Sequence, residues 1–197
     1  MKLLTDREKK QYVWYVGYGS NLCEERFLCY IRGGKFKWGG SLANGCRDKT
    51  PPEESRPIWI PYRLYFAEKS IYWGNGGVAF LYPHREPDEN DWTVGRMWKI
   101  TGNQYEEVKC QEGSWYDNEI PLGEEDGIPI YTFTSKRIRP ICKPSEGYLK
   151  TVALGLMETI NWTNEEIFQY LKRKDGIRDQ MNEDELLKII ESTASSN

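Results

Sequence analysis

The sequence predicts an α+β fold, in which strands come first and most of the helices come last. Short β-branched and aromatic runs bounded by turn residues predict the strands. Apolar residues at helical spacing, some preceded by Ser or Thr caps, predict the helices. Because strands and helices do not alternate regularly, a doubly wound parallel sheet is not expected.

The strands and helices are expected at the following positions. Strands are expected at residues 12–16, 58–67, 77–82, 93–100 and 128–134, and helices at 22–31, 102–109, 149–160, 163–171 and 183–190. Two capping boxes, Thr101 with Gln104 and Thr163 with Glu166, mark helix starts. The Gly- and Pro-rich stretch 35–56 is expected to be a long connection with one strand at most, and a frayed Ser-rich tail follows the last helix.

The charge balance argues against a nucleic-acid partner. The chain has 27 basic and 30 acidic residues, a net charge of −3, whereas a nucleic-acid footprint needs a basic face. The densest basic stretch, residues 172–174, follows a predicted helix and is expected to be a solvated helix end.

Neither export, membrane insertion nor metal binding is expected. Residues 1–10 are charged and no apolar run has the length of a signal peptide or a membrane span, so a cytoplasmic location without membrane contact is expected. The five cysteines lack C-x-x-C spacing and are expected to be reduced thiols. His84 is the one histidine, so neither a zinc site nor a cofactor is expected.

The loop at residues 18–22 is the first candidate site. Its residues are Tyr18, Gly19, Ser20, Asn21 and Leu22. A strand that ends in Gly-Ser-Asn and leads into a helix presents backbone N–H groups that can bind a carboxylate or a phosphate. An ordinary turn with an N-cap explains the same residues. A dinucleotide loop is not expected, because Leu22 stands where the third Gly of G-x-G-x-x-G belongs.

Glu112, within Gln-Glu-Gly, is the candidate general acid/base. A carboxylate at a helix end is usually a surface charge, and it becomes a useful base only if burial raises its pKa. Trp115 and Tyr116 could provide such an environment. A serine hydrolase built on Ser20 and His84 is a competing interpretation, but no G-x-S-x-G elbow surrounds Ser20.

Taken in order, these motifs resemble the gamma-glutamylcyclotransferase family. After the 18–22 loop come Trp73 with the 76–79 Gly-Gly-Val-Ala segment, Gly95-Arg96-Met97-Trp98, the Gln-Glu-Gly at 111–113, and Pro144-Ser145-x-x-Tyr148 before a helix containing Gly155. The resemblance implies a mixed α+β domain built around a small, partly closed β-barrel with helices outside. It also implies one domain over 1–197, with a core at about 12–171 and a C-terminal helical extension at about 172–197.

The resemblance implies a reaction as well. The loop would hold a γ-glutamyl group, a small-molecule substrate, and Glu112 would move a proton while 5-oxoproline forms, without a cofactor or metal. Tyr148, Tyr131 and Tyr116 would line the pocket, the last two matching the family pattern less firmly. Gly17 stands where the family often has Ala, and the 73–77 segment is longer than usual, which leaves the leaving group of the substrate open. A non-catalytic γ-glutamyl or carboxylate binding protein of the same fold remains the alternative.

Overall fold

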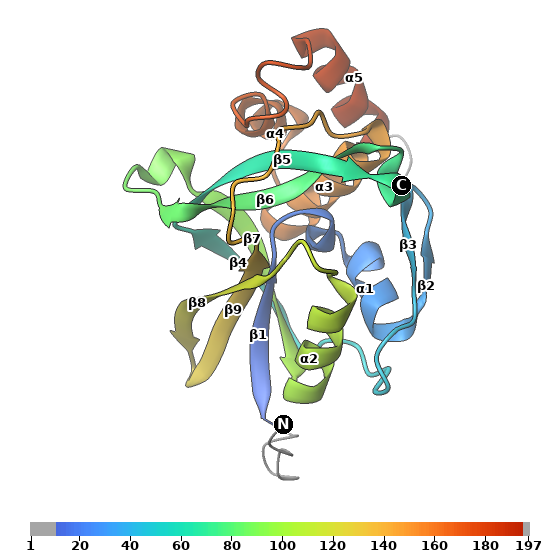
Figure 1. Ribbon diagram of the computed structural model, residues 1–197, viewed down its shortest axis with the longest axis vertical. Helices are drawn as coiled ribbons and strands as arrows, with labels where there is room; N and C mark the ends of the chain where they lie inside the picture. Colours follow the sequence, from blue (N-terminus) through green and yellow to red (C-terminus); the bar gives the residue numbers. More distant parts are fainter. Residues whose placement is uncertain (1–10, 195–197) are drawn as a thin grey trace.

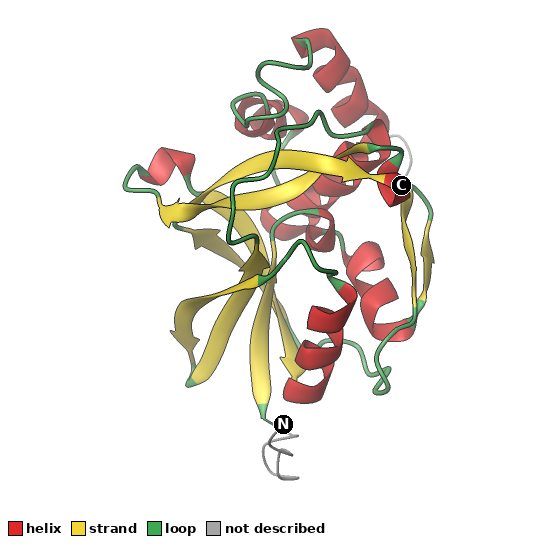
Figure 2. Ribbon diagram, in the orientation of Figure 1, coloured by secondary structure: helices red, strands yellow, loops and turns green. Residues whose placement is uncertain are grey.

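The computed structural model describes residues 11–194 and contains a five-stranded sheet with helices beside it and above it (Figures 1 and 2). The charged segment 1–10 and the end of the Ser-rich tail lie outside the described residues. The strands are β1 (Tyr12–Gly17), β2 (Gly34–Phe36), β3 (Gly39–Ala43), β4 (Ser55–Ile60), β5 (Tyr62–Ser70), β6 (Gly76–Arg85), β7 (Thr93–Thr101), β8 (Asn118–Glu125) and β9 (Ile128–Thr134). The helices are α1 (Glu24–Arg32), α2 (Gly102–Gln111), α3 (Glu146–Ile160), α4 (Asn164–Leu171) and α5 (Glu183–Ala194), with 3₁₀ turns η2 (Ser20–Leu22), η3 (Ile71–Trp73) and η4 (Glu89–Asp91).

Strand β1 lies at the centre of the five-stranded sheet, whose order is β4-β7-β1-β9-β8. It runs antiparallel to β7 and parallel to β9, with Tyr15 opposite Trp98 on one side and Tyr131 on the other. Its apolar and aromatic residues are buried from Trp14 onward, as a central strand requires. The carboxyl end of β1 therefore delivers the 18–22 loop into the middle of the molecule.

The α+β class is confirmed, but a closed barrel is not found among residues 11–194. The strands of this part of the chain form three separate sheets, and β4 and β8 are the edges of the largest one. The β5–β6 hairpin crosses the sheet (Figure 1) and is joined to β9 by a side chain, since the Thr134 hydroxyl accepts from the Leu81 N–H and donates to its carbonyl.

Helix α3 packs directly against the 18–22 loop. A Cβ on Gly155 would lie 2.4 Å from the Leu22 Cβ and 2.5 Å from the Cys23 nitrogen, so the close approach requires a glycine. Helix α5 packs on α3, and its residues Leu186 and Ile190 belong to the same buried apolar cluster as the core of the sheet.

Several boundaries differ from the sequence-based expectation. The expected strand 58–67 is two strands that belong to different sheets, with Pro61 between them. The expected connection 35–56 contains the β2–β3 hairpin. Strand β8 is absent from the expected strands. It is an edge strand with a register shift between Pro121 and Gly123, a place where Pro is tolerated. Helix α1 begins at Glu24 rather than at residue 22, because η2 comes first.

The interpretation of the basic stretch 172–174 also changes. It is not wholly solvated: Lys174 is 1% exposed, lies over the Tyr170 ring, and burial lowers its pKa to about 8. At Gly77, in the 76–79 segment, a Cβ would lie 2.1 Å from the Cys142 carbonyl oxygen, so another stretch of backbone lies against this position. None of the described helices is long and apolar enough to cross a membrane.

Candidate active site

A cavity of about 480 Å³, here called the main cavity, lies between the 18–22 loop, the end of α2 and the η3 turn. A recess of about 30 Å³, the inner recess, adjoins it at the loop. The residues that line both are Ser20, Glu112, Tyr116 and Tyr148. The inner recess has room for about one water-sized group, so it suits the polar end of a ligand whose remainder occupies the main cavity.

Glu112 is placed by helix α2. The capping box of Thr101 and Gln104 starts the helix, and Glu112 is its C-cap, with its N–H donating to the Val108 carbonyl at 3.1 Å. Gly113 follows with φ of 81°, a left-handed conformation that turns the chain away at that point. The capping box and the turn at Gly113 therefore define both ends of the helix, and the position of the carboxylate follows from them.

Two side chains donate hydrogen bonds to the same carboxylate oxygen. The Tyr15 hydroxyl lies 2.6 Å and the Asn21 Nδ2 2.8 Å from Glu112 Oε1, and Asn21 Nδ2 is also 2.9 Å from the Tyr15 hydroxyl. These residues come from β1, the loop and α2, so the network forms only in the folded chain. Tyr15 and Asn21 hold one oxygen of Glu112, and the side chain of Tyr30 also stabilises the charged carboxylate by hydrogen bonding.

The pKa of Glu112 is raised above its ordinary value because burial disfavours the charged form. The hydrogen bonds from Tyr15 and Asn21 and the charge of Arg26 act in the opposite direction without cancelling this effect. Burial and the neighbouring Glu112 raise the pKa of Tyr15 well above its usual value, so Tyr15 keeps its proton and remains the donor. The carboxyl thus sits in an environment that favours its protonated form more than water does, which suits a proton-transfer group.

The β7 segment holds the 18–22 loop from one side. The Trp98 Nε1 donates to the Asn21 carbonyl at 2.9 Å, and the Arg96 guanidinium donates to the Leu22 carbonyl at 3.2 Å. Arg96 also pairs with Glu24 and Glu158. The Gly-Arg-Met-Trp motif therefore contributes to the site by fixing the loop.

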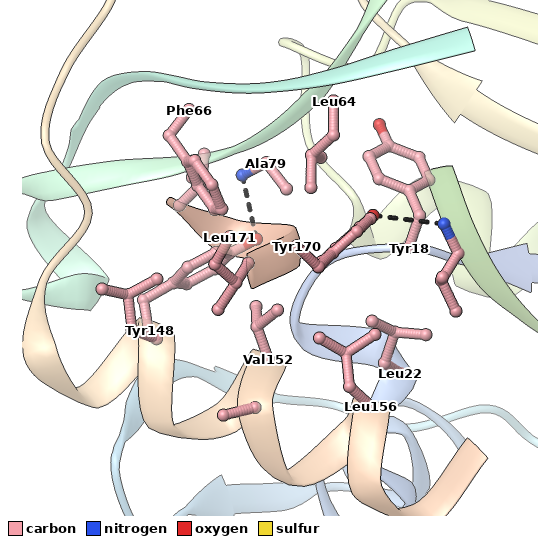
Figure 3. Close-up of a cluster of buried hydrophobic side chains, with 14 of the residues drawn as sticks. Tyr18, Leu22, Leu64, Phe66, Ala79, Tyr148, Val152, Leu156, Tyr170 and Leu171 are labelled. Carbon is pink, nitrogen blue, oxygen red and sulfur yellow. Dashed lines mark hydrogen bonds between the residues drawn. The ribbon is translucent and has the colours of Figure 1, made fainter. Parts of the chain in front are cut away.

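Tyr148 closes the other side of the loop. Figure 3 shows its hydroxyl pointing to Ala79, whose N–H donates to it at 3.0 Å. Burial raises the pKa of Tyr148 to about 12, so the hydroxyl stays protonated. A Cβ on Gly19 would come within 2.5 Å of this hydroxyl, which explains the glycine at that position.

The comparisons with known proteins bear on the fold. No family profile matches the chain. Among curated proteins, a histone deacetylase 5 of Arabidopsis thaliana is 33% identical over 205 residues, which cover 82% of this chain and 30% of that protein. The chain thus spans less than a third of the length of this relative. Among solved structures, a gamma-glutamyl cyclotransferase and an uncharacterized human protein each give a TM-score of 0.57 at 20% identity, covering 92% of this chain and 99% of theirs.

The chain has the gamma-glutamylcyclotransferase fold. The family resemblance seen in the motifs is therefore confirmed at the level of the fold.

On this fold, most of the residues expected from the sequence come together. Those that line the inner recess are Tyr18, Gly19, Ser20, Asn21, Glu112, Tyr116 and Tyr148. Tyr18 and Tyr116 are held by their hydroxyls, which donate to the carbonyls of Phe133 at 2.7 Å and Ala79 at 2.9 Å. His84 is exposed near the end of β6 and lines neither cavity, so it does not join Ser20.

Two expected residues do not line either cavity, which corrects the sequence-based set. Leu22 is buried against α3, and its N–H donates to the Gly19 carbonyl at 3.1 Å, so it has no amide to offer a ligand. Tyr131 packs against Tyr105, with ring centroids 5.8 Å apart. On the same face of β9, Phe133 lies two residues further along and occupies the edge of the inner recess instead.

The sequence did not indicate two residues of the candidate site, Tyr15 and Arg26. Tyr15 was treated only as part of an aromatic strand, although its position two residues before Gly17 places it near the carboxyl end of β1. Arg26 was not considered. A signal for it exists, since Arg26 immediately precedes Phe27 and lies four residues before Tyr30, both of which are buried on α1.

Proposed function

We propose that the chain is a gamma-glutamylcyclotransferase-type enzyme, in which the α-amine of a γ-glutamyl substrate attacks its own γ-amide carbonyl. A C–N bond forms to close the five-membered ring of 5-oxoproline, and the C–N bond to the leaving amine breaks. The observation that carries the proposal is Glu112: a carboxylate with a raised pKa, held by two donors, at the junction of the main cavity and the inner recess.

Glu112 is both acid and base in this mechanism. It takes a proton from the substrate ammonium, which frees the amine for attack, and passes that proton to the departing amine nitrogen. The attacking nitrogen then loses a second proton as the lactam forms, and the released amine takes up this proton and departs as its ammonium ion. Because Tyr15 and Asn21 occupy Oε1, we assign the proton transfer to Oε2. Acid/base help of this kind contributes roughly 10²–10⁴-fold.

The 18–22 loop binds the α-carboxylate of the substrate in this proposal. The backbone N–H groups concerned are those of Gly19, Ser20 and Asn21, since Leu22 uses its own within the turn. Holding the substrate folded brings the amine to the carbonyl of the same molecule, and well-oriented intramolecular reactions gain up to about 7–11 kcal/mol. Attack from within the substrate needs no enzyme nucleophile.

The direct experiment is to incubate the purified protein with several γ-glutamyl compounds and to measure 5-oxoproline. Release of 5-oxoproline with an equal amount of free amine supports the proposal. Binding of these compounds without turnover would favour the alternative, a non-catalytic γ-glutamyl or carboxylate binding protein.

Other properties remain proposals. The membership in the acyltransferase or lyase class follows from the proposed reaction, and a cytoplasmic location without nucleic-acid or membrane partners stays a prediction. The deacetylation named for the Arabidopsis relative stays with that protein, since the similarity covers 30% of its length.

A further inference from the structure

The main cavity contains a buried cation with unused hydrogen-bond donors. Arg26 lines the cavity and is 2% exposed. Its Nε and Nη1 atoms have no hydrogen-bond partner among residues 11–194, and no described carboxylate forms an ion pair with its guanidinium. Since an unpaired buried charge is costly, its retention in a cavity points to a ligand that completes it.

The guanidinium is held in place by contacts with neutral groups, and the acidic Glu112 in the same cavity interacts with its charge without forming an ion pair. It lies over the Tyr30 ring, 4.4 Å from the centroid, and 5.9 Å from the Trp73 ring. On another side is the backbone of Gly40, where a Cβ would lie 3.2 Å from Arg26 Nε. These aromatic and backbone surfaces orient a planar cation well, and a planar cation suits a carboxylate.

The position of Arg26 separates it from the proposed head-group site. Arg26 lines the main cavity but not the inner recess, whereas Gly19 and Asn21 line the recess and not the main cavity. Of the charged residues that line the main cavity, Arg26 and Lys69 are cationic and Glu112 is acidic. If the α-carboxylate of the γ-glutamyl head occupies the recess, the scissile amide and the leaving group lie in the main cavity, which Arg26 lines.

We propose that Arg26 is a specificity-determining residue that binds a carboxylate on the leaving group. The inference rests on the proposed function and narrows it: the preferred substrate is the γ-glutamyl derivative of an amino acid or peptide with a free carboxylate, rather than that of a simple amine. The leaving group departs with its carboxylate still paired to Arg26.

The test is a cycle of two substrates and two proteins. The substrates are a γ-glutamyl-amino acid and the same compound with its leaving-group carboxylate replaced by a carboxamide; the proteins are wild type and Arg26→Met. Wild type is expected to favour the acid in kcat/KM by about 10- to 100-fold, the range for a hydrogen bond to a charged group. In Arg26→Met this ratio falls to about one, with the loss confined to the acid. The intrinsic reactivities of the two amides cancel when the ratio of wild type is divided by the ratio of Arg26→Met, so this quotient is the measure of the role of Arg26.

Each other outcome has a definite meaning. Equal losses on both substrates would overturn the inference, because Arg26 would then act on the α-carboxylate or on Glu112. A wild type that does not prefer the acid would also overturn it, whether or not Arg26→Met folds. If neither compound yields 5-oxoproline, the proposed function itself fails; acid-selective binding, measured by calorimetry on wild type, then decides the role of Arg26, and its absence overturns that role.

Arg32→Met is the matched control, since Arg32 is exposed at the end of the same helix and lines neither cavity. Its acid-to-amide ratio is expected to equal that of wild type. Thermal unfolding gives a second readout: Arg26→Met is expected to be at least as stable as wild type, because it removes an unpaired buried charge. A markedly lower Tm would indicate a structural role and count against the proposal.

Discussion

Asn21 and Glu112, which are 91 positions apart in the sequence, lie within 2.8 Å of each other, and the Asn21 amide donates to the carboxylate. The same amide reaches the hydroxyl of Tyr15, which donates to the same oxygen. The loop that is proposed to bind the substrate and the residue proposed to move the proton are thus a single hydrogen-bonded unit. A substitution in the loop should therefore alter the properties of Glu112, and a substitution of Glu112 should alter the loop.

Tyr15→Phe is expected to move the acid limb of the kcat/KM profile to higher pH. The Tyr15 hydrogen bond lowers the pKa of Glu112, whereas burial raises it. Without the hydrogen bond the pKa of Glu112 should rise further, so the base should become protonated at a higher pH. The measurement is kcat/KM against pH for both proteins.

Tyr105→Phe is the control for this prediction. It also removes a hydroxyl that donates to a carboxylate at 2.6 Å, that of Glu119, but it lies outside both cavities. Its profile should match wild type. If the acid limb of Tyr15→Phe keeps its position or moves to lower pH, the Tyr15 hydroxyl does not lower the pKa of Glu112.

Glu112→Gln is expected to be more stable than wild type at pH 7, with a difference that shrinks as the pH falls through the raised pKa of Glu112 and is gone below the ordinary Glu pKa of about 4.3. The folded-state pKa of Glu112 is raised, so the folded protein binds this proton more tightly than the unfolded chain does. Its contribution to stability is therefore fully present at low pH and is lost as the pH rises through the raised pKa. Denaturation at several pH values checks this, and a difference that grows toward acid pH would contradict the direction of the shift.

Gly155→Ala is expected to destabilise the protein by about 1–3 kcal/mol, because the new Cβ would overpack against Leu22 and the Cys23 backbone. In an exposed helix the same change stabilises by about 1 kcal/mol, so the sign of the effect is informative. A raised Tm would show that α3 does not approach the loop as closely as described. Because the loop must shift, KM for the substrate should rise as well.

Ser20→Pro and Ser20→Ala distinguish a backbone role from a nucleophilic one. Proline removes the N–H at residue 20, so KM should rise by roughly tenfold, the value of one hydrogen bond to a charged group. Alanine keeps the N–H and removes only the hydroxyl, so its steady-state kinetics should stay close to those of wild type. Loss of turnover in Ser20→Ala would instead support a serine nucleophile.

Local patterns were sufficient to predict much of this molecule. Strand β9 matches its expected range, and both capping boxes form as expected, because each depends on residues close in sequence. The strand break at Pro61 and the edge strand β8 could not be seen locally, since which sheet a strand joins is decided by distant partners.

The same limit applies to the site. The loop and Glu112 were found from local motifs and the family resemblance, whereas the role of Tyr15 depends on a partner in α2. The expectation for Tyr131 differs from the structure for a related reason. A strand tyrosine can be assigned to one face of a sheet, but only the register shows that Phe133, and not Tyr131, lines the inner recess. The missing hydrogen-bond partners of Arg26 can be recognised only in the folded structure, where the residues around its cavity are known.

The central claim is that Glu112 performs the proton transfer. Its most direct test is kcat for 5-oxoproline formation by Glu112→Gln, with substrate binding measured in parallel by calorimetry. We predict that kcat falls by roughly two orders of magnitude or more while the Kd for substrate changes little. Near-normal turnover in Glu112→Gln would contradict the account.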